Sequence, residues 1–232
     1  EAISKHLGVD PSWVVPGNGS DEIIDLLFRV LGRPGEHNAV LLEPSFSIYR
    51  MQARLHGLAT RHVPLNQDFS FPWEALLHSA DQDTALVFVT SPDNPSGYAA
   101  RAEEILELAR SLPEQALLVL DEAYIDFADN PELYSPISQL RETGNTVLLR
   151  TFSKIYGLAG LRLGYGIMPP WLADLLQRIK LPFSVNVLAE QAGIEALRDQ
   201  DFRELTRRTV LEQRGLLARS LQERGFLVYP SQ

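Results

Sequence analysis

Short apolar runs alternate with amphipathic helical patterns along most of the chain. The runs are rich in Val, Leu and Ala and are bounded by turn residues, which is typical of buried strands. We expect strands at residues 39–42, 60–63, 85–89, 117–120, 146–149 and 161–167. We expect helices at residues 21–31, 45–55, 102–111 and 171–179. This alternation predicts an α/β fold of βαβ units around a largely parallel sheet.

The pattern changes in the last part of the chain. Residues 187–223 form a long helical stretch of Leu, Ala, Glu and Arg, divided near Asp199, and residues 226–229 resemble the first strand of another unit. We therefore expect a large domain over residues 1–186, whose N-terminal part is missing. Residues 187–232 are expected to be connecting helices and the start of an incomplete C-terminal small domain.

Composition excludes several classes of protein. The 232 residues are 45% hydrophobic and carry a net charge of −9, which argues against a nucleic-acid partner because such proteins usually present a basic face. No apolar run approaches the roughly 20 residues of a membrane span. The chain has no cysteine, so it has neither disulfides nor a thiolate metal site, and this composition suits a cytoplasmic protein.

Residues that can carry chemistry follow four of the predicted strands. In open parallel α/β sheets, ligands bind beyond the carboxyl ends of the strands, so these segments should meet in one crevice. The segments are residues 43–46, 90–97, 121–124 and 150–154. They would supply the ring of Phe46, the amide of Asn94, the carboxylate of Asp121 with the phenol of Tyr124, and the amine of Lys154.

Each of these segments also has a simpler interpretation. A lysine after a strand is usually a solvated surface residue, and residues 91–95 form first of all a turn. An acidic residue closing an apolar strand, as at Asp121, is also the form of an ATPase Walker B segment. That alternative requires a G-x-x-x-x-G-K-[ST] loop, and the sequence contains none.

A glycine-rich segment at residues 16–22 precedes an apolar helical pattern. Its simplest interpretation is a helix start capped by Asn18 or Ser20, with acidic residues in the first turn. The free N–H groups and the positive end of a helix also form an anion site, which glycines allow a phosphate to approach closely.

Five motifs taken in order resemble the fold-type I aminotransferases, which depend on pyridoxal 5'-phosphate (PLP). They are Gly-Asn-Gly-Ser-Asp-Glu at 17–22, Pro-Ser-Phe-Ser-Ile-Tyr at 44–49, Ser-Pro-Asp-Asn-Pro-Ser-Gly at 91–97, Asp-Glu-Ala-Tyr at 121–124 and Ser-Lys-Ile-Tyr-Gly-Leu-Ala-Gly-Leu-Arg-Leu-Gly-Tyr at 153–165. Within that family the resemblance is greatest to histidinol-phosphate aminotransferases. It implies that residues 1–186 are a three-layer α/β/α, PLP-binding domain with a mostly parallel sheet and one antiparallel strand.

The resemblance also implies a role for each group at the strand ends. Lys154 would be the covalent attachment point of the cofactor and the base and acid that moves the substrate proton. Asp121 would pair with the pyridine nitrogen and keep it protonated. Asn94 and Tyr124 would donate hydrogen bonds to the phenolic oxygen of the cofactor, and Phe46 would stack on its ring.

The cofactor phosphate would be held near the glycine-rich segment. The implied ligands are the backbone of Gly19, Ser20 and Asp21, the hydroxyls of Thr151 and Ser153, and the guanidinium of Arg162. Arginine suits a phosphate because its planar fork donates two parallel hydrogen bonds. Arg162 lies at the start of its predicted strand, whereas the other ligands lie at strand ends. For Arg162 to reach the same edge, the strand at 161–167 must run opposite to its neighbours.

The implied activity is amino-group transfer from L-histidinol phosphate, an amino-alcohol phosphate, to 2-oxoglutarate by a cytoplasmic homodimer. Threonine-phosphate decarboxylase and aromatic aminotransferases are alternatives with the same fold. A transcription regulator that uses an aminotransferase-like domain as a ligand sensor is an alternative of another class. The resemblance implies no metal, no nucleic acid and no membrane partner.

Overall fold

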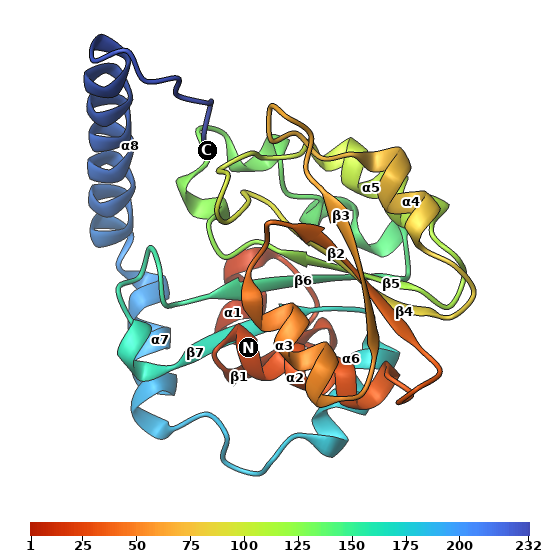
Figure 1. Cartoon of the computed structure of the whole chain (residues 1–232). Helices are drawn as coiled ribbons and strands as arrows, with labels where there is room; N and C mark the ends of the chain where they lie inside the picture. The colour runs from red at the N-terminus through yellow and green to blue at the C-terminus, as the bar shows by residue number, and fades with distance from the viewer.

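The computed structural model describes residues 1–232, and one mixed sheet organises them (Figure 1). Seven strands lie in the order β1-β7-β6-β5-β4-β2-β3. They are β1 (Val14–Asn18), β2 (Asn38–Glu43), β3 (Ala59–Pro64), β4 (Thr84–Thr90), β5 (Leu117–Asp121), β6 (Thr146–Thr151) and β7 (Leu163–Ile167). The six strands predicted between residues 39 and 167 are thus all present, with small shifts at their ends.

Helices cover both faces of this sheet and make it the middle of three layers. The α-helices of the domain are α1 (Ala2–Leu7), α2 (Ser20–Leu31), α3 (Ser47–Leu55), α4 (Trp73–Ser79), α5 (Ala102–Ser111) and α6 (Pro170–Ile179). Short 3-10 helices are η1 (Pro11–Trp13), η2 (Ile125–Phe127), η3 (Pro131–Leu133), η4 (Ile137–Glu142) and η5 (Ala159–Leu161). Helices α2, α3 and α6 bury their apolar residues against one face, and α4 and α5 bury theirs against the other. The α/β/α prediction is confirmed.

The domain has two apolar clusters, one on each face of the sheet, and the alternation of side chains along each strand explains them. In β2, Val40 and Leu42 belong to one apolar cluster, whereas Ala39 and Leu41 belong to the other. Successive side chains of a strand point to opposite faces, so a strand that is apolar at every position has to be covered on both sides. This is the reason that the central strands read as continuous apolar runs in the sequence.

Strand β7 runs against both of its neighbours. It pairs antiparallel with β1 and with β6, whereas the pairs among β2, β3, β4, β5 and β6 are parallel. The predicted reversal is therefore confirmed. Its consequence is that the chain enters β7 at the edge where the parallel strands end.

Some local predictions were wrong. The edge strand β1 was missed because Pro16 and Gly17 suggest a turn, yet an edge strand tolerates a proline. The short helices α1 and α4 were missed too, since neither is long enough to show a clear helical period. Gly19, rather than Asn18 or Ser20, is the N-cap of α2.

The C-terminal part consists of α7 (Val187–Arg198) and α8 (Gln200–Glu223), divided at Asp199 as predicted. Helix α7 packs on the domain through buried Ala189 and Leu197, whereas α8 has no buried residue and projects to one side (Figure 1). The predicted strand at residues 226–229 is absent, because an extended segment becomes a strand only when another strand pairs with it, and none does here. None of the helices combines the length and the apolar character that a membrane span requires.

Arginines attach α8 to the segment that follows β5. Arg203 forms an ion pair with Asp126 at 2.7 Å, and Arg214 forms one with Asp129 at 2.6 Å. Arg207 donates to the carbonyl oxygens of Ala128 at 3.0 Å and of Asp129 at 2.9 Å. Charge rather than apolar burial therefore holds α8 against the domain.

Candidate functional site

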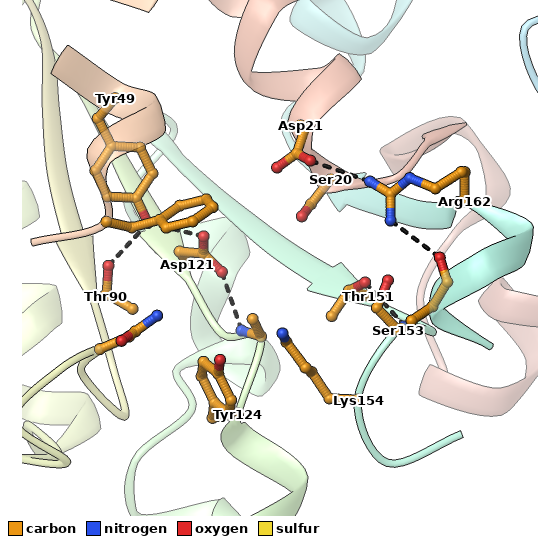
Figure 2. Close-up of a pocket in the computed structure, with 14 residues that line it drawn as sticks. Ser20, Asp21, Tyr49, Thr90, Asp121, Tyr124, Thr151, Ser153, Lys154 and Arg162 are labelled. Atoms are coloured by element: carbon orange, nitrogen blue, oxygen red, sulfur yellow. Dashed lines mark hydrogen bonds and ion pairs between the residues drawn. The ribbon is translucent and has the colours of Figure 1, made fainter. Parts of the chain in front are cut away.

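A cavity of about 190 Å³ opens at the edge where the parallel strands end (Figure 2). Its lining residues are Ser20, Asp21, Phe46, Tyr49, Thr90, Asn94, Asp121, Ala123, Tyr124, Thr151, Ser153, Lys154, Ala159 and Arg162. Every site residue expected from the sequence is among them except Gly19, which immediately precedes Ser20 as the N-cap of α2. Larger hollows elsewhere on the surface lack this convergence of polar groups on one crevice.

Asp121, the last residue of β5, is a buried carboxylate with two donors. Its Oδ2 accepts from the Tyr49 hydroxyl at 2.8 Å, and its Oδ1 accepts from the Ala123 N–H at 3.0 Å. Burial raises the pKa of Asp121 to about 6, against the opposing effect of these hydrogen bonds. No lysine, arginine or histidine forms an ion pair with Asp121. A buried carboxylate without a cation suits a ligand that brings one.

Lys154 lies in the loop after β6, with its amine pointing into the cavity (Figure 2). The Nζ atom lies 5.2 Å from the ring centroid of Tyr124, within the range of a cation–π contact. The side chain forms no ion pair and is accessible from the cavity mouth. Lys154 is thus a primary amine available for reaction, opposite a buried carboxylate.

Asn94, Phe46 and Ser153 complete the wall around this amine. Asn94 lies in the loop after β4 and is partly buried, and Phe46 lies just before α3 with its ring edge against Tyr49, 5.6 Å between centroids. The Ser153 N–H donates to the Thr151 hydroxyl at 3.0 Å, which fixes the turn that leads from β6 into Lys154. The loops after β2, β4 and β6 therefore bring their predicted groups together.

The other end of the cavity, formed by the start of α2 and Arg162 and called the anion end, has groups that can bind an anion. The first N–H groups of α2, from Ser20 onward, have no partner within the helix, and the helix dipole adds positive potential there. Arg162 lies just before β7 in the left-handed conformation, φ 56°, and its Nη2 is 3.1 Å from the Asp21 carboxylate. Its Nη1 donates to the Ala159 carbonyl oxygen at 3.2 Å (Figure 2). These contacts aim the guanidinium at the start of α2.

Gly19 supports this end of the cavity from behind rather than as a donor. Its N–H donates to the carbonyl oxygen of Arg162 at 3.0 Å, so that N–H is already engaged. Its φ is 76°, a conformation that L side chains rarely adopt, and an added Cβ would lie 2.5 Å from Arg162 Nη2. Glycine at this position lets the arginine lie against the turn.

A buried ion pair fixes the ends of two neighbouring strands below the cavity. The Nε of Arg150 donates to the Glu122 carboxylate at 2.8 Å, and its Nη2 donates to the Ser135 hydroxyl at 3.1 Å. The Glu122 side chain is fully buried, and its burial raises its pKa despite the arginine. Because Glu122 follows Asp121 and Arg150 precedes Thr151, the pair holds two functional strand ends in register.

Sequence reasoning gave no role to two polar residues of the cavity, Tyr49 and Thr90, although both lie in the segments it singled out. Two signals could have found them. Thr90 is the last residue of β4, so the strand-end rule includes it. Tyr49 follows Phe46 by three positions at the start of α3, and residues three apart lie on the same helix face. The small residues Ala123 and Ala159 carry no comparable signal.

Replacing Gly164 with alanine is expected to lower stability and to disrupt the anion end. A Cβ on Gly164 would overlap the backbone nitrogen of Ser20, so β7 and the turn before α2 would have to separate. Overpacking of this kind costs about 1–3 kcal/mol. Thermal unfolding and binding of inorganic phosphate would measure both effects.

Gly160→Ala is the matched control for this substitution, because nothing lies within 4 Å of a Cβ at that position. A Gly164→Ala protein as stable as the Gly160→Ala protein would contradict the close approach described here.

The arrangement can bind an anionic group at one end and a cationic group at the other, with a nucleophilic amine between them. No group of three or more histidine or acidic side chains lies close enough to hold a metal ion. The site therefore offers covalent and acid–base chemistry by an amine rather than a set of metal ligands.

Comparison with known proteins agrees with this geometry. A model of the aminotransferase class I and II family matches residues 1–232. The histidinol-phosphate aminotransferase of Oleidesulfovibrio alaskensis is 55% identical over 230 residues, which are 99% of this chain and 60% of that protein. The enzyme of the same name from Nitratidesulfovibrio vulgaris strain DP4 is 53% identical over 230 residues, 99% of this chain and 62% of that protein.

A solved structure shows the same fold with a ligand. The crystal structure of histidinol-phosphate aminotransferase from Sinorhizobium meliloti, in complex with pyridoxal-5'-phosphate, superposes with a TM-score of 0.93 at 32% identity. The match covers 99% of this chain and 62% of that one. The chain thus spans about three fifths of the length of these relatives. Since the family model matches the whole of it, the chain belongs to the aminotransferase class I and II family.

Proposed function

We propose that this chain is the cofactor-binding part of a histidinol-phosphate aminotransferase, with PLP attached to Lys154. The observation that carries the proposal is the placement of the Lys154 amine between the buried, cation-free carboxylate of Asp121 and the anion end at Arg162. The names of the relatives at 53% and 55% identity support the substrate.

The residues present fit PLP at each of its polar groups. Asp121 has no cation of its own, and a protonated pyridine nitrogen would supply one. Asn94 and Tyr124 line the wall beside Lys154 and would donate to the ring oxygen. Phe46 has its ring at the cavity and would pack on the cofactor face.

The phosphate would occupy the anion end. The N–H groups of Ser20 and Asp21, the hydroxyls of Thr151 and Ser153, and the guanidinium of Arg162 would hold it. A phosphate there also gives Arg162 a stronger partner than Asp21, with which it shares a half-exposed ion pair of little energetic value.

When bound, PLP supplies an electron sink for the bond that breaks at the amino carbon of the substrate. The chain would do the rest. Once the substrate amine has replaced Lys154 on the cofactor, the freed Nζ would take the proton from that carbon and return it to another atom, for which a flexible primary amine of adjustable pKa is suited. Asp121 would hold the ring nitrogen in its cationic form, and the anion end would fix the orientation of the ring.

The test is an assay with defined amino donors. The complete enzyme of which this chain would be part, supplied with PLP and 2-oxoglutarate, should form glutamate from L-histidinol phosphate much faster than from L-phenylalanine. Faster glutamate formation from phenylalanine would favour an aromatic aminotransferase. Release of carbon dioxide from L-threonine O-3-phosphate would favour the decarboxylase. No PLP binding at all would overturn the proposal.

A cytoplasmic homodimer is part of the same proposal. Apolar side chains lie exposed on the segment between α6 and α7, with Phe183 98% exposed and Leu181 67% exposed. Exposed apolar surface of this kind marks contacts with other protein. Light scattering of the purified protein should give the mass of two chains, and a monomer at micromolar concentration would contradict this part.

A further inference from the structure

Tyr49 is a buried residue of the cavity whose polar group serves only other cavity residues. Its side chain is 1% exposed, and its hydroxyl lies 2.8 Å from the Asp121 carboxylate and 2.8 Å from the Thr90 hydroxyl. The ring stacks on Phe88, 4.6 Å between centroids, and meets Phe46 edge-on. A tyrosine held in this way has one position for its hydroxyl.

The direction of these hydrogen bonds follows from the number of protons. Asp121 in its ionised form only accepts, so the single proton of the Tyr49 hydroxyl goes to the Asp121 Oδ2. The Tyr49 oxygen is then an acceptor, and the Thr90 hydroxyl donates to it. Burial and the negative charge of Asp121 raise the pKa of Tyr49 well above its usual value, so the phenol keeps its proton.

We propose that Tyr49 is a positioning residue, which with Thr90 fixes the Asp121 carboxylate toward the ring nitrogen of the cofactor and stabilises its charge. The inference rests on the proposed function, because it assigns Asp121 that partner. The Ala123 N–H holds the other carboxylate oxygen, so both oxygens have a donor and the plane of the carboxylate is set. Without Tyr49, one oxygen of a buried anion would have no donor from the protein.

Other charged groups around Asp121 do not supply this stabilisation. Asp21 of α2 and the neighbouring Glu122 both act to raise the pKa of Asp121, as does burial. The hydrogen bonds from Tyr49 and from the Ala123 N–H oppose them. Lys154 lies across the cavity and forms no ion pair with the carboxylate, and the charge of Glu122 is compensated by Arg150. Tyr49 is therefore the side chain on which the ionised form depends.

The experiment is Tyr49→Phe, which keeps the ring and removes only the hydroxyl. PLP affinity, measured by absorbance from pH 5 to pH 8, should fall at least about tenfold near neutral pH, because a hydrogen bond to a charged group is lost. In the PLP-free protein, carbon NMR of the Asp121 carboxyl should show its titration midpoint raised by about one pH unit or more from about 6. A purely structural role would leave that midpoint in place.

Tyr98→Phe is the matched control, because the Tyr98 hydroxyl has no hydrogen-bond partner and lies outside the cavity. Thr90→Val provides a second variant, in which the Tyr49 hydroxyl remains but loses its donor; a smaller shift in the same direction is expected. The melting temperatures of all variants would show whether a variant has lost stability or only the positioning of the Asp121 carboxylate.

The outcomes separate this inference from the proposed function. Wild-type protein that binds PLP, with Tyr49→Phe showing the same affinity and the same Asp121 midpoint as Tyr98→Phe, overturns the inference alone. Wild-type protein that binds no PLP overturns the proposed function, and the NMR midpoint still decides whether Tyr49 stabilises the Asp121 anion.

Discussion

Replacing Lys154 with alanine is expected to abolish amino-group transfer, with a loss of roughly 10⁴-fold or more in turnover. The side chain carries the only amine that lines the cavity, so the substitution removes both the covalent attachment point and the group that moves the proton. The anion end and Asp121 remain, so PLP should still bind, but reversibly. Steady-state rates of glutamate formation and gel filtration with PLP would measure the two effects.

Chemical labelling provides the control for this prediction. The lysines of the chain are Lys5, Lys154 and Lys180. Borohydride reduction of the PLP-loaded protein followed by peptide mapping should place the pyridoxyl group on Lys154, since Lys5 lies exposed on α1 and Lys180 donates to the Pro16 carbonyl oxygen. A label on either of the other lysines would refute the assignment.

Replacing Asp121 with asparagine is expected to lower turnover by about 10²–10³-fold while much of the PLP binding is retained. Asparagine keeps the shape of the side chain but removes the charge that holds a cationic ring nitrogen. That charge matters most when electrons move toward the ring, so the substitution should reduce kcat more than it reduces affinity.

Asp174→Asn is the control, because Asp174 lies in an exposed i,i+4 ion pair with Arg178 on α6 and should tolerate the loss of charge. Near-normal turnover in the Asp121→Asn protein would remove the carboxylate from the proposed mechanism.

The wild-type protein adds a pH test. Since the pKa of Asp121 in the PLP-free protein is about 6, PLP affinity should fall as the pH drops below about 6 and the carboxyl becomes neutral.

The sequence predicted the layers and the central strands well because their signals are local. A strand such as β4 is apolar at every position from Ala85 to Val89 and is followed by a turn, which leaves little choice of structure. The reversal of β7 was predicted from a different signal, the need for Arg162 to reach the phosphate. The edge strand β1 could not be read in the same way, because its Pro16 and Gly17 are acceptable only through the pairing with β7.

The candidate site was predictable as far as its groups follow strands or belong to motifs. The chain carries no local sign that the Gly19 N–H is engaged by the Arg162 carbonyl oxygen, since this contact joins segments far apart in sequence. The same holds for the contact of Tyr49 with Asp121, 72 positions apart. Residue types at strand ends therefore indicated the chemistry of the site. Which residue binds a ligand and which holds another residue in place depends on tertiary contacts.

The pairing of β1 with β7 has a consequence for the order in which the protein folds. Loop closure costs more entropy the longer the chain between two contacts, and contacts between distant residues form slowly. Val14 pairs with Ile167, whereas the other strands of the parallel sheet pair with partners much nearer in sequence. The carboxylate and amine parts of the cavity, on β5 and after β6, can thus form from a compact central segment. The anion end can form only after β1 has paired with β7, so phosphate binding would mark the completion of folding.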